Sequence, residues 1–405
     1  MNKYRLNELG TVNRGKSKHR PRNDPQLYAG KYPFIQTGDV KHSPFYVTSH
    51  TQTYNDKGLE QSKLWPKGTL CITIAANIAD TAILSYPACF PDSIIGFLPK
   101  KNISDVKYIK YCLDTFKMQM QSISRGTTQD NMSLEKLLSI EFPAPRLGLQ
   151  KKIAAVLSSY DDLIEVNKRR IALLEKMAEE LYREWFVRMR FPGHQHTHFV
   201  KGVPEGWEET EFGKIATFTM GQSPKSEFYN VVGEGLPFHQ GVGTYGNRFP
   251  NTVTYCSVSG RQAHKGDILF SVRAPVGRLN IADQKMIIGR GLAAIHHRDG
   301  KNSYFYYLLK TIFANEDIIG NGAIFNSVGK GELSRLAIFR HPKNLIDDFE
   351  KNVRQIDDEI ENLIRANSIL TQTRDLLLPR LISGKLSVEN LDIQFPPGMR
   401  DATGQ

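Results

Sequence analysis

Apolar side chains recur at alternating spacings of three and four residues in two stretches of the chain, each stripe including one Asn. The first stripe consists of Ile153, Val156, Tyr160, Leu163, Asn167, Leu174, Met177 and Leu181. The second consists of Phe349, Val353, Ile356, Ile360, Leu363, Asn367, Leu370, Leu377 and Leu381. A stripe that repeats about every 3.5 residues is typical of the seam of a coiled coil. The pattern therefore predicts two long helices, although Pro379 is expected to disturb the last turns of the second.

The segments in front of the two helices carry the same succession of short patterns. Five pairs of segments correspond in order: 32–40 with 236–243, 67–73 with 265–273, 93–98 with 286–295, 108–116 with 305–313, and 123–133 with 319–328. They predict a Pro-Phe-x-Gln strand before a glycine turn, a Lys-Gly turn and strand, a further strand, a short helix, and a polar glycine loop. The same succession of predicted elements therefore occurs twice in the chain.

These patterns together predict a mixed α/β (α+β) fold. Two repeated mixed α/β domains are joined by two long antiparallel helices that form a coiled-coil spine. The expected boundaries are 1–147 for the first domain, 148–191 for the first helical region, 192–341 for the second domain, 342–386 for the second helical region and 387–405 for a C-terminal tail.

One Asn in each stripe bears on how the helices pair. Asn167 and Asn367 occupy corresponding seam positions 200 residues apart, each near the middle of its helix. A buried Asn in a seam costs stability but fixes the register, because only an opposing polar group satisfies it. We therefore predict antiparallel packing with Asn167 near Asn367. The alternative is that both side chains face solvent or another subunit.

The spacing of the repeats suggests a two-headed molecule. A helix of about 40 residues at about 1.5 Å per residue spans roughly 60 Å, enough to hold two domains about one turn of B-DNA apart, ~34–36 Å. Because the two halves differ in sequence, their targets are expected to differ as well. The prediction is an asymmetric bipartite DNA site with an unread spacer. The alternative is a non-enzymatic scaffold whose two heads bind proteins.

The positive charge lies in the two repeated domains. The net charge is +11. Residues 1–147 carry 20 Lys and Arg against 12 Asp and Glu, and residues 191–342 carry 16 against 12. Two basic domains joined by nearly neutral helices suit a polyanion held at two places. The four scattered cysteines and the absence of an apolar leader or membrane span predict a cytoplasmic protein.

Arg and Lys contact guanine and phosphate, and Asn and Gln contact adenine. A basic loop predicted to lie on DNA phosphates contains Arg14, Lys16, Lys18, Arg20 and Arg22. The candidate base contacts of the first domain are Gln36, Thr37, Arg125, Thr127, Thr128, Gln129 and Asn131. Those of the second are Gln240, Tyr245, Asn247, Arg248, Arg273, Arg278 and Asn326. Each of them has an alternative role as a turn or capping residue.

Three motifs suggest other chemistry and are set aside. Residues 10–17 match the phosphate-loop pattern GxxxxGK[ST], but Pro21 and Pro25 follow too closely for the helix that such a loop requires. Residues 241–246 match a dinucleotide fingerprint without a helix after them. His194, His196 and His198 lie at a Pro-Gly linker, where a solvated tether is favoured over a metal site. No amino-methyltransferase or nuclease motif is found, so we expect a non-catalytic chain without bound metal or cofactor.

Several strings resemble the specificity subunits of type I restriction-modification systems. They are RGTTQDNMSLEKL (125–137), LYREWFVRMRFPGH (181–194), VPEGWEETEFGKI (203–215) and LLLPRLISGKL (376–386). The resemblance extends from residue 1 to about 386. In the second domain, IGNGAIFNSV lacks the Thr-Thr-Gln-Asp of its counterpart, so different DNA readout is expected in the two halves.

The resemblance implies partners as well as DNA. It implies double-stranded DNA as the ligand, two methyltransferase subunits that clamp the helices, and restriction/translocase subunits that join them. S-adenosylmethionine, ATP and magnesium are expected only on those partner subunits, and no contact with a membrane is expected.

Overall fold

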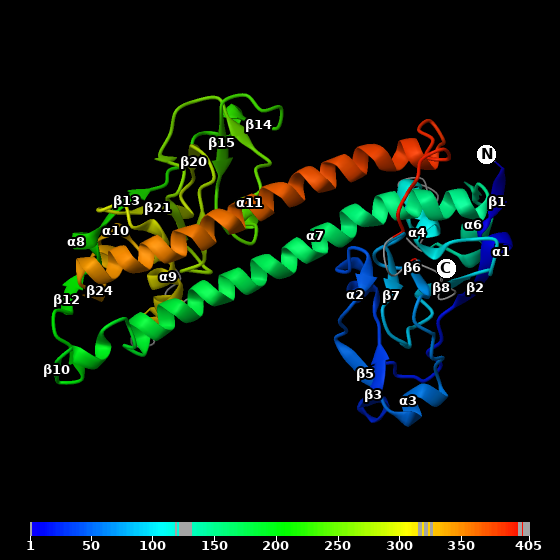
Figure 1. The fold of residues 1–405 in the computed structure, drawn as a ribbon, viewed down its shortest axis with the longest axis horizontal. Coiled ribbons are helices and arrows are strands. Elements are labelled where there is room, and N and C mark those ends of the chain that lie inside the picture. Colours follow the sequence, from blue (N-terminus) through cyan, green and yellow to red (C-terminus); the bar gives the residue numbers. More distant parts are fainter. Residues whose placement is uncertain are drawn as a thin grey trace. The chain divides into compact units, whose positions relative to one another are not determined.

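The computed structural model describes residues 2–117, 120, 132–314, 318–319, 323–324, 327–395 and 399. The chain divides into two compact units. Unit 1 comprises residues 1–168 and 365–405, and unit 2 comprises residues 169–364. Each unit thus combines one of the two repeated domains with parts of both long helices (Figure 1). No helix in the described part of the chain has the length and apolar character needed to cross a membrane.

Unit 1 is built on a five-stranded sheet. Its strands, in spatial order, are β2 (Gly10–Arg14), β8 (Ile94–Pro99), β6 (Leu70–Thr73), β7 (Thr81–Leu84) and β4 (Tyr46–Val47). All neighbouring pairs are antiparallel except β4 with β7. The strands at the centre of the sheet are buried runs of apolar residues, because α4 (Val106–Thr115) and the start of α7 pack into the same core.

Smaller elements complete unit 1. Two two-stranded sheets pair β1 (Lys3–Arg5) with β9 (Glu141–Pro143) and β3 (Tyr28–Phe34) with β5 (Gln52–Tyr54). The short helices are α1 (Leu6–Leu9), α2 (Thr37–Lys41), α3 (Asp56–Glu60), α6 (Leu134–Leu138) and the 3-10 turn η1 (Pro25–Leu27).

Unit 2 repeats this plan. Its main sheet has the order β13 (Ala216–Met220), β21 (Leu292–His297), β18 (Ile268–Ser271) and β19 (Leu279–Ile281), all antiparallel. The helix α9 (Asn302–Ile312) covers it as α4 does in unit 1. The strand β12 (Glu208–Glu211), the helix α8 (Phe212–Ile215) and β13 follow one another as β1, α1 and β2 do, and β12 pairs with β24 (Ala337–Arg340).

Unit 2 has a second sheet, which contains five strands. Its order is β14 (Tyr229–Asn230), β16 (Tyr255–Cys256), β15 (Leu236–His239), β20 (Met286–Ile288) and β17 (Gln262–Ala263). The remaining elements are β10 (Phe199–Val200), β11 (Val203–Pro204), β22 (Ile318–Ile319), β23 (Ala323–Ile324), α10 (Lys330–Ser334), and the turns η3 (His194–His196), η4 (Ser226–Phe228) and η5 (Val242–Thr244).

One correspondence from the sequence is corrected by the strand pairing. β8 pairs with β2 and β6, and β21 pairs in the same way with β13 and β18. The Ile-Ile-Gly string at 287–289, which looks like the one at 94–96, instead overlaps β20, in a different sheet. Residues 94–99 therefore correspond to residues 292–297. The Ile-Ile-Gly sequence occurs in two buried strands that are not equivalent.

The two long helices are α7 (Leu147–Tyr182), extended by a π-helical turn over Arg183–Val187, and α11 (Lys343–Ile382). In unit 1 the Asn167 Nδ2 atom donates to Asn367 Oδ1 at 2.9 Å, and Asp161 pairs with Arg374. Asp161 precedes Asn167 in α7, whereas its partner Arg374 follows Asn367 in α11. The two helices therefore pack antiparallel (Figure 1). In unit 2 the Arg170–Glu359 ion pair, at 2.7 Å, lies between the same two helices.

Some details of the helices differ from the prediction. Pro379, which was expected to disturb the last turns, lies inside α11, and the helix continues through it to Ile382. Leu163 and Met177, placed in the seam by the spacing, are about half exposed, whereas Ala154, Leu157 and Ala178 are buried. The Tyr111 hydroxyl donates to Asp161, and the Tyr307 hydroxyl donates to Asp357 in the same way. Equivalent residues of the two repeats are therefore 196 positions apart. Asn167 and Asn367 are therefore in contact without being exact counterparts.

Candidate nucleic-acid interface

In unit 1 the basic segment and the turn at Gln36, both predicted to contact DNA, are hydrogen-bonded to the same loop, residues 89–94. The Gly15 and Lys16 amides donate to the carbonyls of Ile94 and Phe90 at 2.8 and 3.0 Å. The Ile35 amide, just before Gln36, donates to the Cys89 carbonyl at 2.8 Å. A Cβ at position 15 would lie 2.3 Å from the Pro91 carbonyl oxygen, so only glycine allows this close approach. The basic segment and the Gln36 turn are thus held beside one another.

The cations of the basic segment are not equivalent. Arg22 pairs with Asp92 at 2.8 Å, and the Arg20 guanidinium donates to the Ser17 and His19 carbonyls. Arg14 and Lys18 are exposed and Lys16 is half-buried. These three form no ion pair with any residue that the structure describes. They are the cations best placed to bind phosphate without first breaking an internal contact.

Gln36 and Thr37 begin α2. The Gln36 amide N–H donates to the Asp39 carboxylate at 2.8 Å, and the Gln36 side chain donates to Gln52 Oε1 at 2.5 Å. Gln36 is nevertheless exposed, and Thr37 is half-buried in the first helical position. Gln36 therefore caps the helix through its backbone while its amide side chain remains at the surface.

Unit 2 contains the same framework with different side chains. The Gly221 and Gln222 amides donate to the Leu292 and Ile288 carbonyls at 2.9 and 3.0 Å. A Cβ at Gly221 would lie 2.1 Å from the Gly289 carbonyl oxygen, which reproduces the close approach at Gly15. The Ser223 hydroxyl donates to Gln240 Oε1 at 2.9 Å and accepts from the Arg290 amide at 3.2 Å. Gln240 is thus joined to the segment that corresponds to the basic loop of unit 1.

The other predicted contacts of unit 2 divide into exposed and half-buried residues. Asn247, Arg273 and Arg278 are exposed, and Arg273 forms a backbone bridge with Ser327. Tyr245 is half-buried, and burial raises the pKa of its hydroxyl above the usual value. Its oxygen has no hydrogen-bond partner in the described part of the chain.

The prediction that Arg248 contacts DNA is wrong in this structure. Its side chain is 2% exposed and pairs with Asp357 of α11, with Glu175 of α7 3.9 Å away. Burial opposes the charged form, but the charge of the adjacent Asp357 carboxylate outweighs it and raises the pKa of Arg248 above its usual value. Arg248 therefore joins the recognition domain to the helices, whereas its neighbour Asn247 stays at the surface.

Some predicted residues cannot be placed. Arg125, Thr127, Thr128, Gln129, Asn131 and Asn326 lie outside the described residues.

Three residues at these sites were missed by the sequence prediction. Gln52 bonds to Gln36, Ser223 bonds to Gln240, and Arg290 is exposed beside Ser223. The signal for Ser223 was present, because Gly221-Gln222-Ser223 corresponds to Gly15-Lys16-Ser17 in the repeat. Nothing in the local pattern marked Gln52 or Arg290.

The structure also bears on the motifs that were set aside. Residues 10–14 form the edge strand β2, and Lys16 is followed by irregular chain rather than by a helix. All four cysteines are free and buried. Among the described residues, His, Cys, Asp and Glu form no group of three or more that could hold a metal ion.

Comparison with known families agrees with this duplicated arrangement. The family model described as the type I restriction modification DNA specificity domain matches residues 1–176 and 204–338. The chain belongs to this family. The two matched ranges correspond to the two recognition domains, so the duplication found in the sequence and the structure is the family's domain occurring twice.

Similar proteins carry the same description. A putative type I restriction enzyme MjaX specificity subunit from Methanocaldococcus jannaschii is 34% identical over 302 residues, covering 72% of this chain and 70% of the relative. The MjaIX specificity subunit of the same organism is 27% identical, covering 90% and 89%. A crystal structure of the S subunit of a type I restriction-modification system from M. genitalium has a TM-score of 0.61 at 17% identity, covering 94% of this chain and 96% of that one. At that identity the likeness concerns the fold alone.

Proposed function

We propose that this DNA specificity subunit reads an asymmetric bipartite site on double-stranded DNA, one half with each unit. The observation that carries the proposal is the shared framework at Gly15 and Gly221, which presents different side chains in the two units. Lys16 stands where unit 2 has Gln222. A conserved backbone arrangement with different polar surfaces suits two readers of two different sequences.

Within each unit we assign phosphate contacts and base contacts to different residues. Arg14, Lys16 and Lys18 are proposed to hold the DNA backbone, because they are accessible cations without carboxylate partners in the described chain. Gln36, Gln240 and Asn247 are proposed to contact base edges, because exposed amides form paired hydrogen bonds with adenine.

The helices are the proposed attachment site for partner subunits. Leu163, Val166, Ile369 and Leu376 of unit 1 are between 47% and 72% exposed. Large apolar side chains gathered on two adjacent helices are typical of a protein–protein interface. We propose that methyltransferase subunits bind the helices and that restriction/translocase subunits join them. The chain itself is then non-catalytic, with S-adenosylmethionine, ATP and magnesium held by those partners. A scaffold with two protein-binding heads is not favoured, because the matched domain is a DNA specificity domain.

The test is methylation mapping of a host genome in the presence of an intact, expressed methyltransferase. Deleting the gene is expected to abolish adenine methylation at one asymmetric bipartite motif. Restoring it with Asn247→Ala or Gln240→Ala is expected to relax the sequence requirement of one half-site and leave the other unchanged, since each good base contact contributes about 1–3 kcal/mol of discrimination.

The control for these variants is Gln284→Ala, another exposed amide of unit 2 that is not among the proposed contacts. It should restore the original motif. An unchanged methylome after deletion would contradict the proposal and favour the protein-binding scaffold. Equal relaxation of both half-sites by Asn247→Ala would contradict the division of the site between the units.

A further inference from the structure

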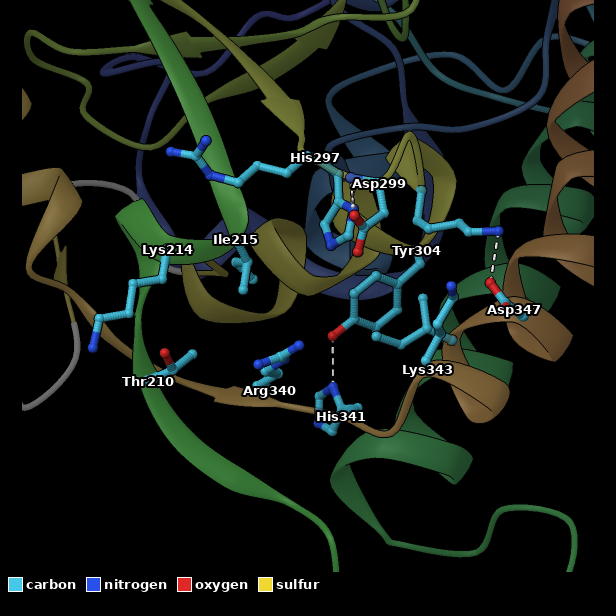
Figure 2. Close-up of a pocket in the computed structure, with 13 residues that line it drawn as sticks. Thr210, Lys214, Ile215, His297, Asp299, Tyr304, Arg340, His341, Lys343 and Asp347 are labelled. Carbon is cyan, nitrogen blue, oxygen red and sulfur yellow. Dashed lines mark hydrogen bonds and ion pairs between the residues drawn. The ribbon is translucent and has the colours of Figure 1, made fainter.

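A cavity of about 250 Å³ lies in unit 2 at the start of α11, apart from the loops assigned to DNA (Figure 2). Residues of α8, the turn after β21, the end of β24 and the first turn of α11 line it. Its charged lining residues are Lys214, Arg298, Lys301, Arg340, Lys343, Asp299 and Asp347. With five cations against two carboxylates, the cavity has an excess of three positive charges.

Most of these cations lack a carboxylate partner. Lys301 pairs with Asp347 at 2.7 Å, and the Arg298 guanidinium donates to the Gly213 carbonyl at 3.1 Å. Lys214, Arg340 and Lys343 form no ion pair with any residue in the described ranges. Figure 2 shows Arg340 and Lys343 near the buried Tyr304 and His341, and the Lys214 ammonium group pointing away from them. Like charges brought together around one hollow repel one another, and a bound anion would relieve that repulsion.

The backbone at the start of α11 adds N–H donors, which carry a partial positive charge. α11 contains 40 residues and begins directly after Pro342, which has no side-chain oxygen to cap it. Its first backbone hydrogen bond runs from Ile346 to the Pro342 carbonyl at 3.1 Å. The amides of residues 343–345 donate to no acceptor within the described chain. Such unsatisfied N–H groups, with the partial positive charge of the helix dipole, favour an anion.

Two buried histidines complete the lining. His297 is 4% exposed and His341 is 5% exposed. Burial lowers the pKa of His297 to about 4 and that of His341 to about 3, so both rings are neutral near pH 7. His341 Nδ1 is hydrogen-bonded to the Tyr304 hydroxyl at 2.5 Å. Which of the two groups donates depends on the tautomer of the ring.

At the corresponding place in unit 1, a buried amide side chain forms hydrogen bonds with the backbone. There the buried Gln150 side chain donates to the carbonyls of Pro145 and Ile103 at 2.7 and 3.0 Å and accepts from the Asp105 amide. The residue 196 positions later is Ile346, which has no polar side-chain atoms. The two units therefore differ at this place, because unit 2 has no polar side chain at the position of Gln150.

We propose that this cavity binds a phosphate-class oxyanion. The planar guanidinium of Arg340, the ammonium group of Lys343 and the free amides at the start of α11 together match the several oxygens and double charge of a phosphoryl group. The shared chemistry has two sources: free phosphate or a small phosphate ester, and a phosphate of the nucleic-acid backbone. The site is argued from its own geometry and does not depend on how the chain reads DNA.

The test is titration of the full chain with inorganic phosphate at constant ionic strength, followed by calorimetry and ³¹P NMR. We expect saturable one-site binding, weakened at least tenfold by Arg340→Gln and by Lys343→Gln. Lys285→Gln removes one exposed charge of unit 2 outside the cavity and should bind phosphate like the unaltered chain. Unfolding midpoints of all three variants verify that the fold is retained.

Two results would overturn the proposal: an absence of saturable binding, or an equal loss of binding in Lys285→Gln. Non-specific duplex DNA distinguishes the two sources. If the DNA backbone supplies the anion, Arg340→Gln weakens DNA binding relative to Lys285→Gln and phosphate competes with DNA. If a free phosphate supplies it, the two variants bind DNA equally while only Arg340→Gln loses phosphate.

Discussion

At the scale of single residues, a buried charge network connects each recognition domain to the helices. In unit 1, Arg374 of α11 and Tyr111 of the domain both bind Asp161. In unit 2, Asp357 and Tyr307 occupy the same roles, but the arginine, Arg248, comes from the recognition domain. The two units therefore use one Tyr–Asp arrangement with an arginine supplied from opposite sides of the contact.

Replacing Arg248 is expected to destabilise unit 2. Arg248→Met leaves Asp357 buried without its partner, which costs about 3–5 kcal/mol in comparable buried pairs. Urea unfolding measures the loss, and Arg273→Met, at an exposed arginine, should change the free energy of unfolding by less than about 0.5 kcal/mol. Adding Asp357→Asn to Arg248→Met should recover part of the loss. Equal stability of the two single variants would contradict the role given to Arg248.

The buried histidine His341 predicts a pH dependence. Because its pKa is lowered to about 3 in the folded protein, the unfolded chain takes up the proton first as the pH falls below about 6.5. Stability is therefore complete above that pH and declines below it, by up to about 1.4 kcal/mol per pH unit for this residue. His341→Gln should make the urea midpoint fall less between pH 7 and pH 5. Identical slopes for variant and parent would refute this.

At the scale of elements, the Asn167–Asn367 hydrogen bond is expected to set the register of the helix pair. Asn367→Leu alone leaves the buried Asn167 amide unpaired and should cost about 1–3 kcal/mol. Replacing both with Leu should restore stability while allowing other registers. A disulfide between Arg170→Cys and Glu359→Cys, which replace a direct ion pair, reports the register. Its yield should fall in the double-Leu background, and an undiminished yield would show that Asn does not specify the register.

The long helices were predictable because each apolar stripe extends over about eight to nine turns. The order of the domain elements was predictable because the same succession of patterns occurs twice in the sequence. Which face of each helix is buried was less predictable. Leu163 fits the seam spacing yet is exposed, because the domains as well as the opposite helix cover these helices and move the buried face. A single stripe in the sequence does not separate these two kinds of contact.

The candidate interface was only partly predictable for a related reason. Arg248 and Asn247 are adjacent polar residues in the same loop, and their sequence context is alike. Their difference comes from Asp357, 109 residues away, which draws the arginine into the interior. Similarly, the cavity at Arg340 is assembled from four segments between residues 210 and 347. Long-range partners of this kind are invisible to local patterns.

At the scale of the whole molecule, the two units differ in how the chain builds them. Unit 2 is one continuous stretch, 169–364, whereas unit 1 closes only when residues after 365 return to it. Leu381, Ile382 and Val388 lie in the same core as Leu6 and Ile153. During synthesis on the ribosome, all of unit 2 emerges before unit 1 has its last core residues. A chain released before residue 365 therefore has a complete second unit and a first unit whose core lacks Leu381, Ile382 and Val388.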